Sequence, residues 1–123
     1  MPDNLSDEQK SVMLAKAMGW QVVEHNKRRC TIGHIGERIG VIDYPFNLYA
    51  PANFALAWKV LNWATEHEQN LRVIENGKSK PLAWVIYMTE FMLLPPADAQ
   101  RLWLDKILEL AIEAGLVEVD DVA

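Results

Sequence analysis

The chain has 123 residues, of which half are apolar and 24% are charged, and its formal net charge at pH 7 is -5. This length suits one hydrophobic core, so we expect a single domain over 1–123 with a flexible acidic tail at 116–123. The negative charge argues against binding of long nucleic acid, which needs clustered basic residues, and the single cysteine excludes a disulfide within the chain.

The first predicted element is a helix over Asp7–Met18. Ser6, followed three residues later by Gln9, is typical of a capping box. Gly19 can adopt the left-handed conformation that ends a helix. Aromatic and β-branched residues follow directly at 20–23, which favours a strand. We therefore expect this helix to pack against a sheet.

A glycine-rich stretch, CTIGHIGERIGVID, spans residues 30–43. Its glycines, Gly33, Gly36 and Gly40, match neither the dinucleotide fingerprint nor the phosphate-binding loop, and no helix follows them to supply free amides. We predict one irregular hairpin over 26–45, with the glycines at turns and bulges. The alternative, in which the backbone here lines a ligand, stays open.

Three further elements complete the predicted fold. An apolar stripe predicts a heavily buried helix over 51–68. Asn76-Gly77 predicts a hairpin over 71–87, whose second arm pairs late or lies at an edge because it contains Pro81. A last helix is predicted over 97–114, with an ion pair between Arg101 and Asp105 on its exposed side. The fold class is α+β, a small and mainly antiparallel sheet with three helices packed on it.

Three segments of the sequence are similar to features of a known protein family. Residues 16–20 read KAMGW, Phe46–Pro51 leads to Ala57-Trp58, and 108–114 read LELAIEA. In these features the chain resembles the phage ABA-sandwich domain family, small proteins of bacteriophages and prophages, over nearly its whole length. The resemblance implies a phage origin and a helix-sheet-helix sandwich, and it implies no settled activity.

The candidate ligand site combines basic and aromatic residues that lie near one another in the sequence. Guanidinium groups bind phosphates through paired donors, and aromatic rings stack on bases. This mixture predicts a small, nucleotide-like anion as ligand; the alternative is a solvated basic loop that balances the acidic C-terminus. The predicted ligand-binding residues are Arg28, Arg29, His34, Arg38, Tyr44 and Tyr49.

Metal binding and nucleophilic catalysis are the other kinds of chemistry to consider. The three histidines show no i, i+4 spacing, so we expect no metal site. Cys30 and His34 could form a nucleophile and base on one strand face, but a lone cysteine is more often a buried hydrophobe. We expect neither catalysis nor a cofactor. Self-association is expected, and Trp63 is a candidate for contact with a partner subunit.

The expected location is the host cytoplasm. The apolar run over 81–89 is far shorter than the roughly 20 residues of a membrane span, and the first ten residues, MPDNLSDEQK, do not resemble a secretory signal. The resulting hypothesis is a non-enzymatic phage accessory protein that binds a nucleotide-like ligand, with sequestration of a host immune signalling nucleotide as one use. The alternative is a protein-interaction or structural phage module without a small-molecule ligand.

Overall fold

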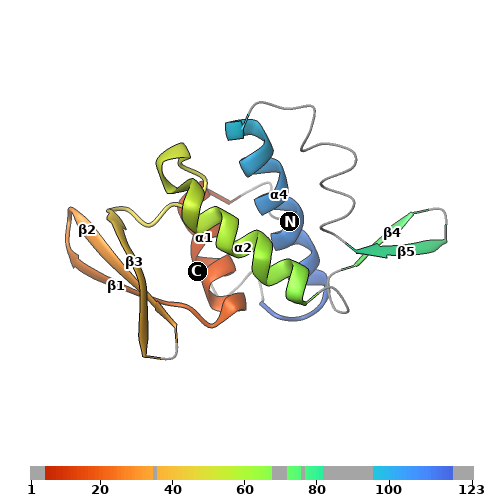
Figure 1. Ribbon diagram of the computed structural model, residues 1–123, viewed down its shortest axis with the longest axis horizontal. Coiled ribbons are helices and arrows are strands. Elements are labelled where there is room, and N and C mark those ends of the chain that lie inside the picture. Colours follow the sequence, from red (N-terminus) through yellow and green to blue (C-terminus); the bar gives the residue numbers. More distant parts are fainter. Residues whose placement is uncertain (1–4, 35, 68–71, 76, 82–95, 118–123) are drawn as a thin grey trace.

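The computed structural model describes residues 5–34, 36–67, 72–75, 77–81 and 96–117. Within them, three helices form the centre of the molecule, a three-stranded antiparallel sheet lies at one end and a two-stranded hairpin at the other (Figure 1). The α+β class is thereby confirmed. The elements in chain order are α1 (Asp7–Met18), β1 (Gln21–Asn26), β2 (Arg29–His34), β3 (Glu37–Asp43), a 3-10 turn η2 (Pro51–Asn53), α2 (Phe54–Glu66), β4 (Arg72–Glu75), β5 (Lys78–Pro81) and α4 (Pro96–Glu113).

Helix α1 has the predicted bounds because its ends are set by local chemistry. The Gln9 amide donates to Ser6 Oγ at 3.2 Å, and the Ser6 amide donates to Gln9 Oε1 at 2.9 Å, which completes the capping box. At the other end Gly19 has φ of 75°, and the Trp20 amide donates to the Ala15 carbonyl at 2.8 Å. The chain then enters β1 directly, as predicted.

The glycine-rich stretch forms one irregular hairpin, β2–β3, as predicted, and β1 joins it as the third strand of a meander. The order is β1-β2-β3, all antiparallel. Ile32 pairs with Gly40 and Gly33 pairs with Arg38, which leaves Ile39 as the extra residue of a β-bulge. A Cβ on Gly33 would lie 3.2 Å from the Glu37 carbonyl oxygen, and Gly36 has φ of 79°. These two glycines serve a bulge and a turn, as predicted.

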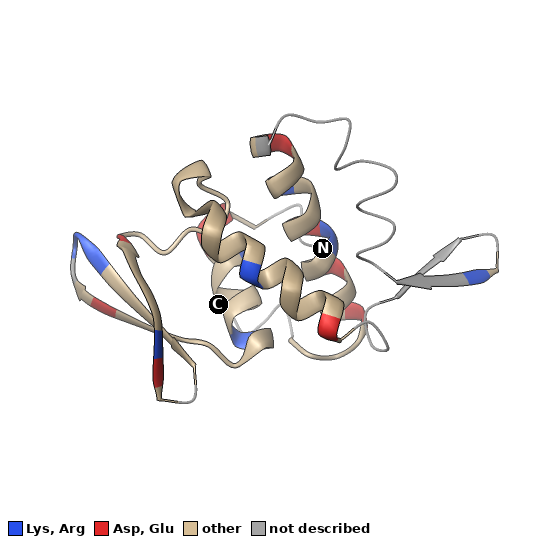
Figure 2. Cartoon of the chain, in the orientation of Figure 1, with Lys and Arg blue, Asp and Glu red and all other residues tan. Residues whose placement is uncertain are grey.

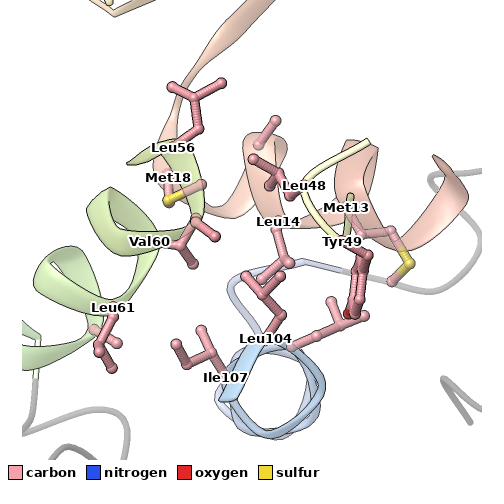
Figure 3. Packing of buried hydrophobic residues seen from close by; sticks show 14 of the residues in the cluster. Met13, Leu14, Met18, Leu48, Tyr49, Leu56, Val60, Leu61, Leu104 and Ile107 are labelled. Carbon is pink, nitrogen blue, oxygen red and sulfur yellow. The ribbon is translucent and has the colours of Figure 1, made fainter. Parts of the chain in front are cut away.

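The core joins one face of the sheet to all three helices. Cys30 and Ile32 of β2 are fully buried in it. Strand β3 lies beside α2 at Gly40, where a Cβ would be 4.0 Å from Leu56 Cδ2, an ordinary van der Waals distance. Figure 3 shows the helices contributing large apolar side chains to this core, among them Met13, Leu14, Val60, Leu61, Leu104 and Ile107.

The remaining elements differ slightly from prediction. Helix α2 ends at Glu66, and α4 is followed by Gly115 with φ of 76°. In the second hairpin, pairing begins at once between Glu75 and Lys78 and ends with Pro81 opposite Arg72, so the pairing is not late. The alternative expectation holds for the described residues, because β5 belongs to a two-stranded sheet and lies at its edge. The rest of the predicted second arm, residues 82–87, lies outside the described residues. So do 118–123 of the predicted tail, whereas Val117 is buried in the core.

Charged side chains join α1 to α4 in place of the predicted ion pair within α4. Arg101 donates two hydrogen bonds to the Asp7 carboxylate, at 2.8 and 2.7 Å. Asp105 Oδ1 accepts from Lys10 Nζ at 2.9 Å and from the Tyr49 hydroxyl at 2.7 Å. The pairing of Arg101 with Asp105 is therefore replaced by contacts that hold two helices together.

Candidate functional site

The predicted arginines lie at opposite ends of the sheet. Arg28 lies in the turn between β1 and β2, where the Tyr44 amide donates to its carbonyl at 2.8 Å, and Arg29 begins β2. His34 and Arg38 lie at the other end of β2, about 13 to 16 Å away at roughly 3.3 Å per strand residue. Figure 2 shows basic segments at both ends of this sheet. The fold therefore does not bring the three guanidinium groups to one site.

Tyr49 is a core residue. Its side chain is only 4% exposed, and its ring lies between Lys10 and Arg101, whose Nζ and Cζ atoms are 4.8 and 5.0 Å from the ring centroid. Burial, reinforced by the hydrogen bond to Asp105, raises the pKa of the Tyr49 hydroxyl. A ring buried to this degree is not available for stacking on a ligand base.

The loop that carries Tyr49 is held by hydrogen bonds to α1 and α4. The Leu48 amide donates to Ser11 Oγ at 2.8 Å, and Gln100 Nε2 donates to the Leu48 carbonyl at 2.8 Å. Both polar partners are buried. Tyr44 and Tyr49 are therefore near in sequence only, because Tyr44 stays exposed at the sheet while this loop enters the core.

His34 belongs to a different constellation, an open cleft of about 290 Å³ between the sheet and α2. Three parts of the chain line it: the junction of α1 with β1, the β2–β3 hairpin and one face of α2. The lining residues are Met18, Trp20, His34, Ile39, Lys59, Asn62, Trp63 and Glu66. We take this cleft as the candidate site because it gathers aromatic, basic, acidic and amide side chains.

The wall of the cleft that α2 forms consists of residues at helical spacing. Lys59, Asn62, Trp63 and Glu66 are at i, i+3, i+4 and i+7, so they share one face of the helix. Lys59 and Glu66 are two turns apart, about 10 Å along the axis at 1.5 Å per residue. Figure 2 shows a basic and an acidic segment separated along α2. The cleft therefore has a positive end and a negative end on this wall.

The sheet wall depends on the bulge and on the end of α1. The bulge makes Ile39 the unpaired residue of β3, and Ile39 lines the cleft beside His34. A Cβ on Gly19 would lie 3.6 Å from His34 Nε2, so the imidazole packs against the left-handed end of α1. Bulges commonly redirect side chains next to functional sites. Here the bulge determines which residue of β3 faces α2.

Trp63 is an aromatic residue of the cleft whose ring is held by a neighbouring side chain. His67 stacks on its ring with the centroids 4.7 Å apart and the planes at 29°, and the His67 imidazole is 2.9 Å from the Trp63 carbonyl oxygen. One face of the indole is thus covered by the protein. The rest of the Trp63 side chain is partly buried, and it contributes to the lining of the cleft.

A second depression continues along α2. It has a volume of about 530 Å³ and shares Lys59 and Asn62 with the cleft. Its other lining residues are Phe54, Ala55 and Trp58. The rings of Phe54 and Trp58 stack with their centroids 6.1 Å apart. This groove is more apolar than the cleft and is therefore suited to contact with another apolar surface.

The structure separates Cys30 from the cleft. Its side chain is fully buried, and burial, with a smaller effect of Glu24, raises the pKa of the thiol. The neutral, enclosed thiol lacks the accessible thiolate that a nucleophile needs. Among the described residues, no three His, Cys, Asp or Glu side chains come together as a metal site, and no helix is long and apolar enough to span a membrane.

Comparisons of the chain with family models, with curated proteins and with solved structures found no match. Of the six residues predicted to bind a ligand, the cleft contains His34 alone. The prediction missed Lys59, Asn62 and Glu66. These three polar residues interrupt the otherwise apolar α2 at helical spacing beside Trp63, and that spacing was the signal available in the sequence.

Proposed function

We propose that the protein binds a small, nucleotide-like organic anion in the cleft and catalyses no reaction on it. One observation carries this proposal: segments distant in the sequence place Trp20, Trp63, His34 and Lys59 around one hollow. Aromatic rings and a few convergent polar groups are typical of small-molecule sites. Stacking would supply affinity, and the lysine would neutralise the anionic group.

The biological role that we propose follows from the resemblance to phage ABA-sandwich proteins. A phage accessory protein in the host cytoplasm that holds a nucleotide without turning it over would remove that nucleotide from its receptors. Sequestration of a signalling nucleotide of host immunity fits this behaviour. It requires tight binding and no catalytic group, which agrees with the enclosed position of Cys30.

A thermal-shift screen tests the proposal. The compounds are nucleoside monophosphates, cyclic dinucleotides, cyclic ADP-ribose isomers and simple phosphates. A ligand at 100 times its Kd stabilises the folded state by about 2.7 kcal/mol, which is readily measured. We expect one class of compound to raise Tm in the wild type and to lose its effect in Trp63→Ala.

The matched control is Arg29→Met, which removes an exposed cation at the start of β2, next to the basic turn at 27–28. This variant should respond to the ligand as the wild type does. If Arg29→Met abolishes the shift while Trp63→Ala retains it, the ligand binds at the basic turn and the cleft is not the site. If no compound shifts Tm, the ligand-binding proposal is wrong.

A second proposal, a protein-interaction module, is favoured by the apolar groove along α2. Ala55 is exposed at this groove, beside Phe54 and Trp58. We propose that a second copy of the chain docks there. Light scattering should then show a dimer for the wild type and a monomer for Ala55→Glu. A monomeric wild type at high concentration would contradict self-association.

A further inference from the structure

We propose that the cleft is selective for a nucleoside monophosphate whose base carries an exocyclic amino group, with the phosphate at Lys59 and the amino group at Glu66. This inference rests on the proposed ligand-binding function and specifies the ligand and its orientation. Three features of the cleft support this assignment: its charge, the spacing of its two charged residues and the hydrogen-bonding chemistry of a carboxylate.

The charge of the cleft favours one phosphate. Among the described residues that line it, Lys59 is the basic side chain and Glu66 the acidic one, beside His34. The arginines that would neutralise additional phosphates, Arg28, Arg29 and Arg38, do not line the cleft. One ammonium group offsets part of the charge of one phosphate, whereas a longer phosphate chain would add negative charge that extends toward the glutamate and is repelled.

The spacing of the charges favours a ligand with separated polar ends. Lys59 and Glu66 are about 10 Å apart along the helix axis. A nucleoside monophosphate in an extended conformation has a comparable length from its phosphate to the far edge of its base. Asn62 and Trp63 lie between the two charged residues on the same face. The amide is placed to bond the sugar, and the indole is placed to stack on the base.

The carboxylate at the far end selects the base. An ionised glutamate accepts hydrogen bonds and donates none. It therefore pairs with the amino group of adenine or cytosine and opposes the carbonyl oxygen that hypoxanthine or uracil presents at the same edge. Sites built on such a hydrogen bond discriminate strongly against an analogue that cannot form it.

Isothermal titration calorimetry with AMP, adenosine and IMP tests the assignment. We expect AMP to bind the wild type at least tenfold more tightly than adenosine, because Lys59 contacts the phosphate, and at least tenfold more tightly than IMP, because Glu66 contacts the amino group. Lys59→Met should remove the preference for AMP over adenosine. Glu66→Gln should remove the preference for AMP over IMP, since the glutamine amide can also donate to a carbonyl.

Both positions are exposed on α2, so these variants preserve the core. Glu113→Gln, exposed on α4, is the control for the loss of one negative charge and should bind as the wild type does. Equal affinity of the wild type for AMP and IMP, or for AMP and adenosine, overturns the assignment.

The two levels of the proposal can be told apart. If AMP and CMP do not bind but another compound of the screen binds through Trp63, this inference is wrong and the proposed function stands. If no compound binds, the proposed function is wrong and this inference falls with it. If AMP binds with both preferences and each variant removes its own preference, the orientation is established.

Discussion

Tyr49→Phe separates two interpretations of Tyr49, the sequence-based prediction of a ligand-stacking residue and the observed position in the core. The substitution keeps the ring between Lys10 and Arg101 and removes only the hydroxyl that donates to Asp105 at 2.7 Å. A hydrogen bond to a charged group contributes about 1.5–3 kcal/mol. Because Asp105 keeps Lys10 and its side chain is 40% exposed to water, we expect a loss near the lower end, about 1–2 kcal/mol.

Urea unfolding followed by tryptophan fluorescence measures this loss, with an unchanged m value showing that the same surface is exposed. Tyr44→Phe is the matched control, since Tyr44 is 38% exposed, and it should remain within about 0.5 kcal/mol of the wild type. The shift in Tm produced by a cleft ligand should be the same in the wild type and in Tyr49→Phe. An unchanged stability of Tyr49→Phe, or a loss of ligand binding, would refute the assignment of Tyr49 to the core network.

Three other predictions concern the stability of the fold and the accessibility of Cys30. Hydrogen bonding to Arg101 lowers the pKa of Asp7, so its stabilising effect is present above the unfolded-state pKa near 3.8 and is lost as the pH falls through the folded-state value. Asp7→Asn should therefore cost up to about 1 kcal/mol at pH 7 and progressively less below pH 3.8 in acid titrations of stability. Gly33→Ala should lower the free energy of unfolding by about 1 kcal/mol, because the new methyl group would lie 3.2 Å from the Glu37 carbonyl oxygen. Unchanged thermal stability would contradict this expectation and show that the backbone at the bulge moves without cost. Cys30 should react with a thiol reagent at pH 8 only after unfolding in urea, and prompt reaction of the folded protein would contradict its burial.

Features with a local physical cause could be predicted from the sequence. The capping box at Ser6 and the left-handed glycine at Gly19 depend on residues within one or two turns of the helix end. The second hairpin likewise depends on its turn, where Gly77 has φ of 76°. These helix ends and this turn form at the expected residues because nothing distant in the chain competes with the local preference.

Features that depend on distant contacts could not be predicted in this way. The apparent pairing of Arg101 with Asp105 is locally favourable, yet Asp105 bonds instead to Lys10, which is 95 positions away in the sequence. The same limitation applies to the arginines near the glycine-rich stretch. Proximity in the sequence indicated one site, but an intervening strand carries Arg29 and Arg38 to opposite ends of the sheet.

The glycines of residues 30–43 contribute to the candidate site through the backbone shape they permit. Gly33 allows the bulge that leaves Ile39 facing the cleft, and Gly36, with φ of 79°, allows the turn between β2 and β3. Neither role uses free backbone amides to hold a phosphate, which is how a phosphate-binding loop works. In the proposed binding mode the anionic group is held by a side chain of α2, and the glycines position the wall that faces it. A substitution that fills Gly33, where a Cβ would lie 3.2 Å from the Glu37 carbonyl oxygen, should therefore weaken ligand binding by shifting the bulge, even though the glycine itself contacts no ligand.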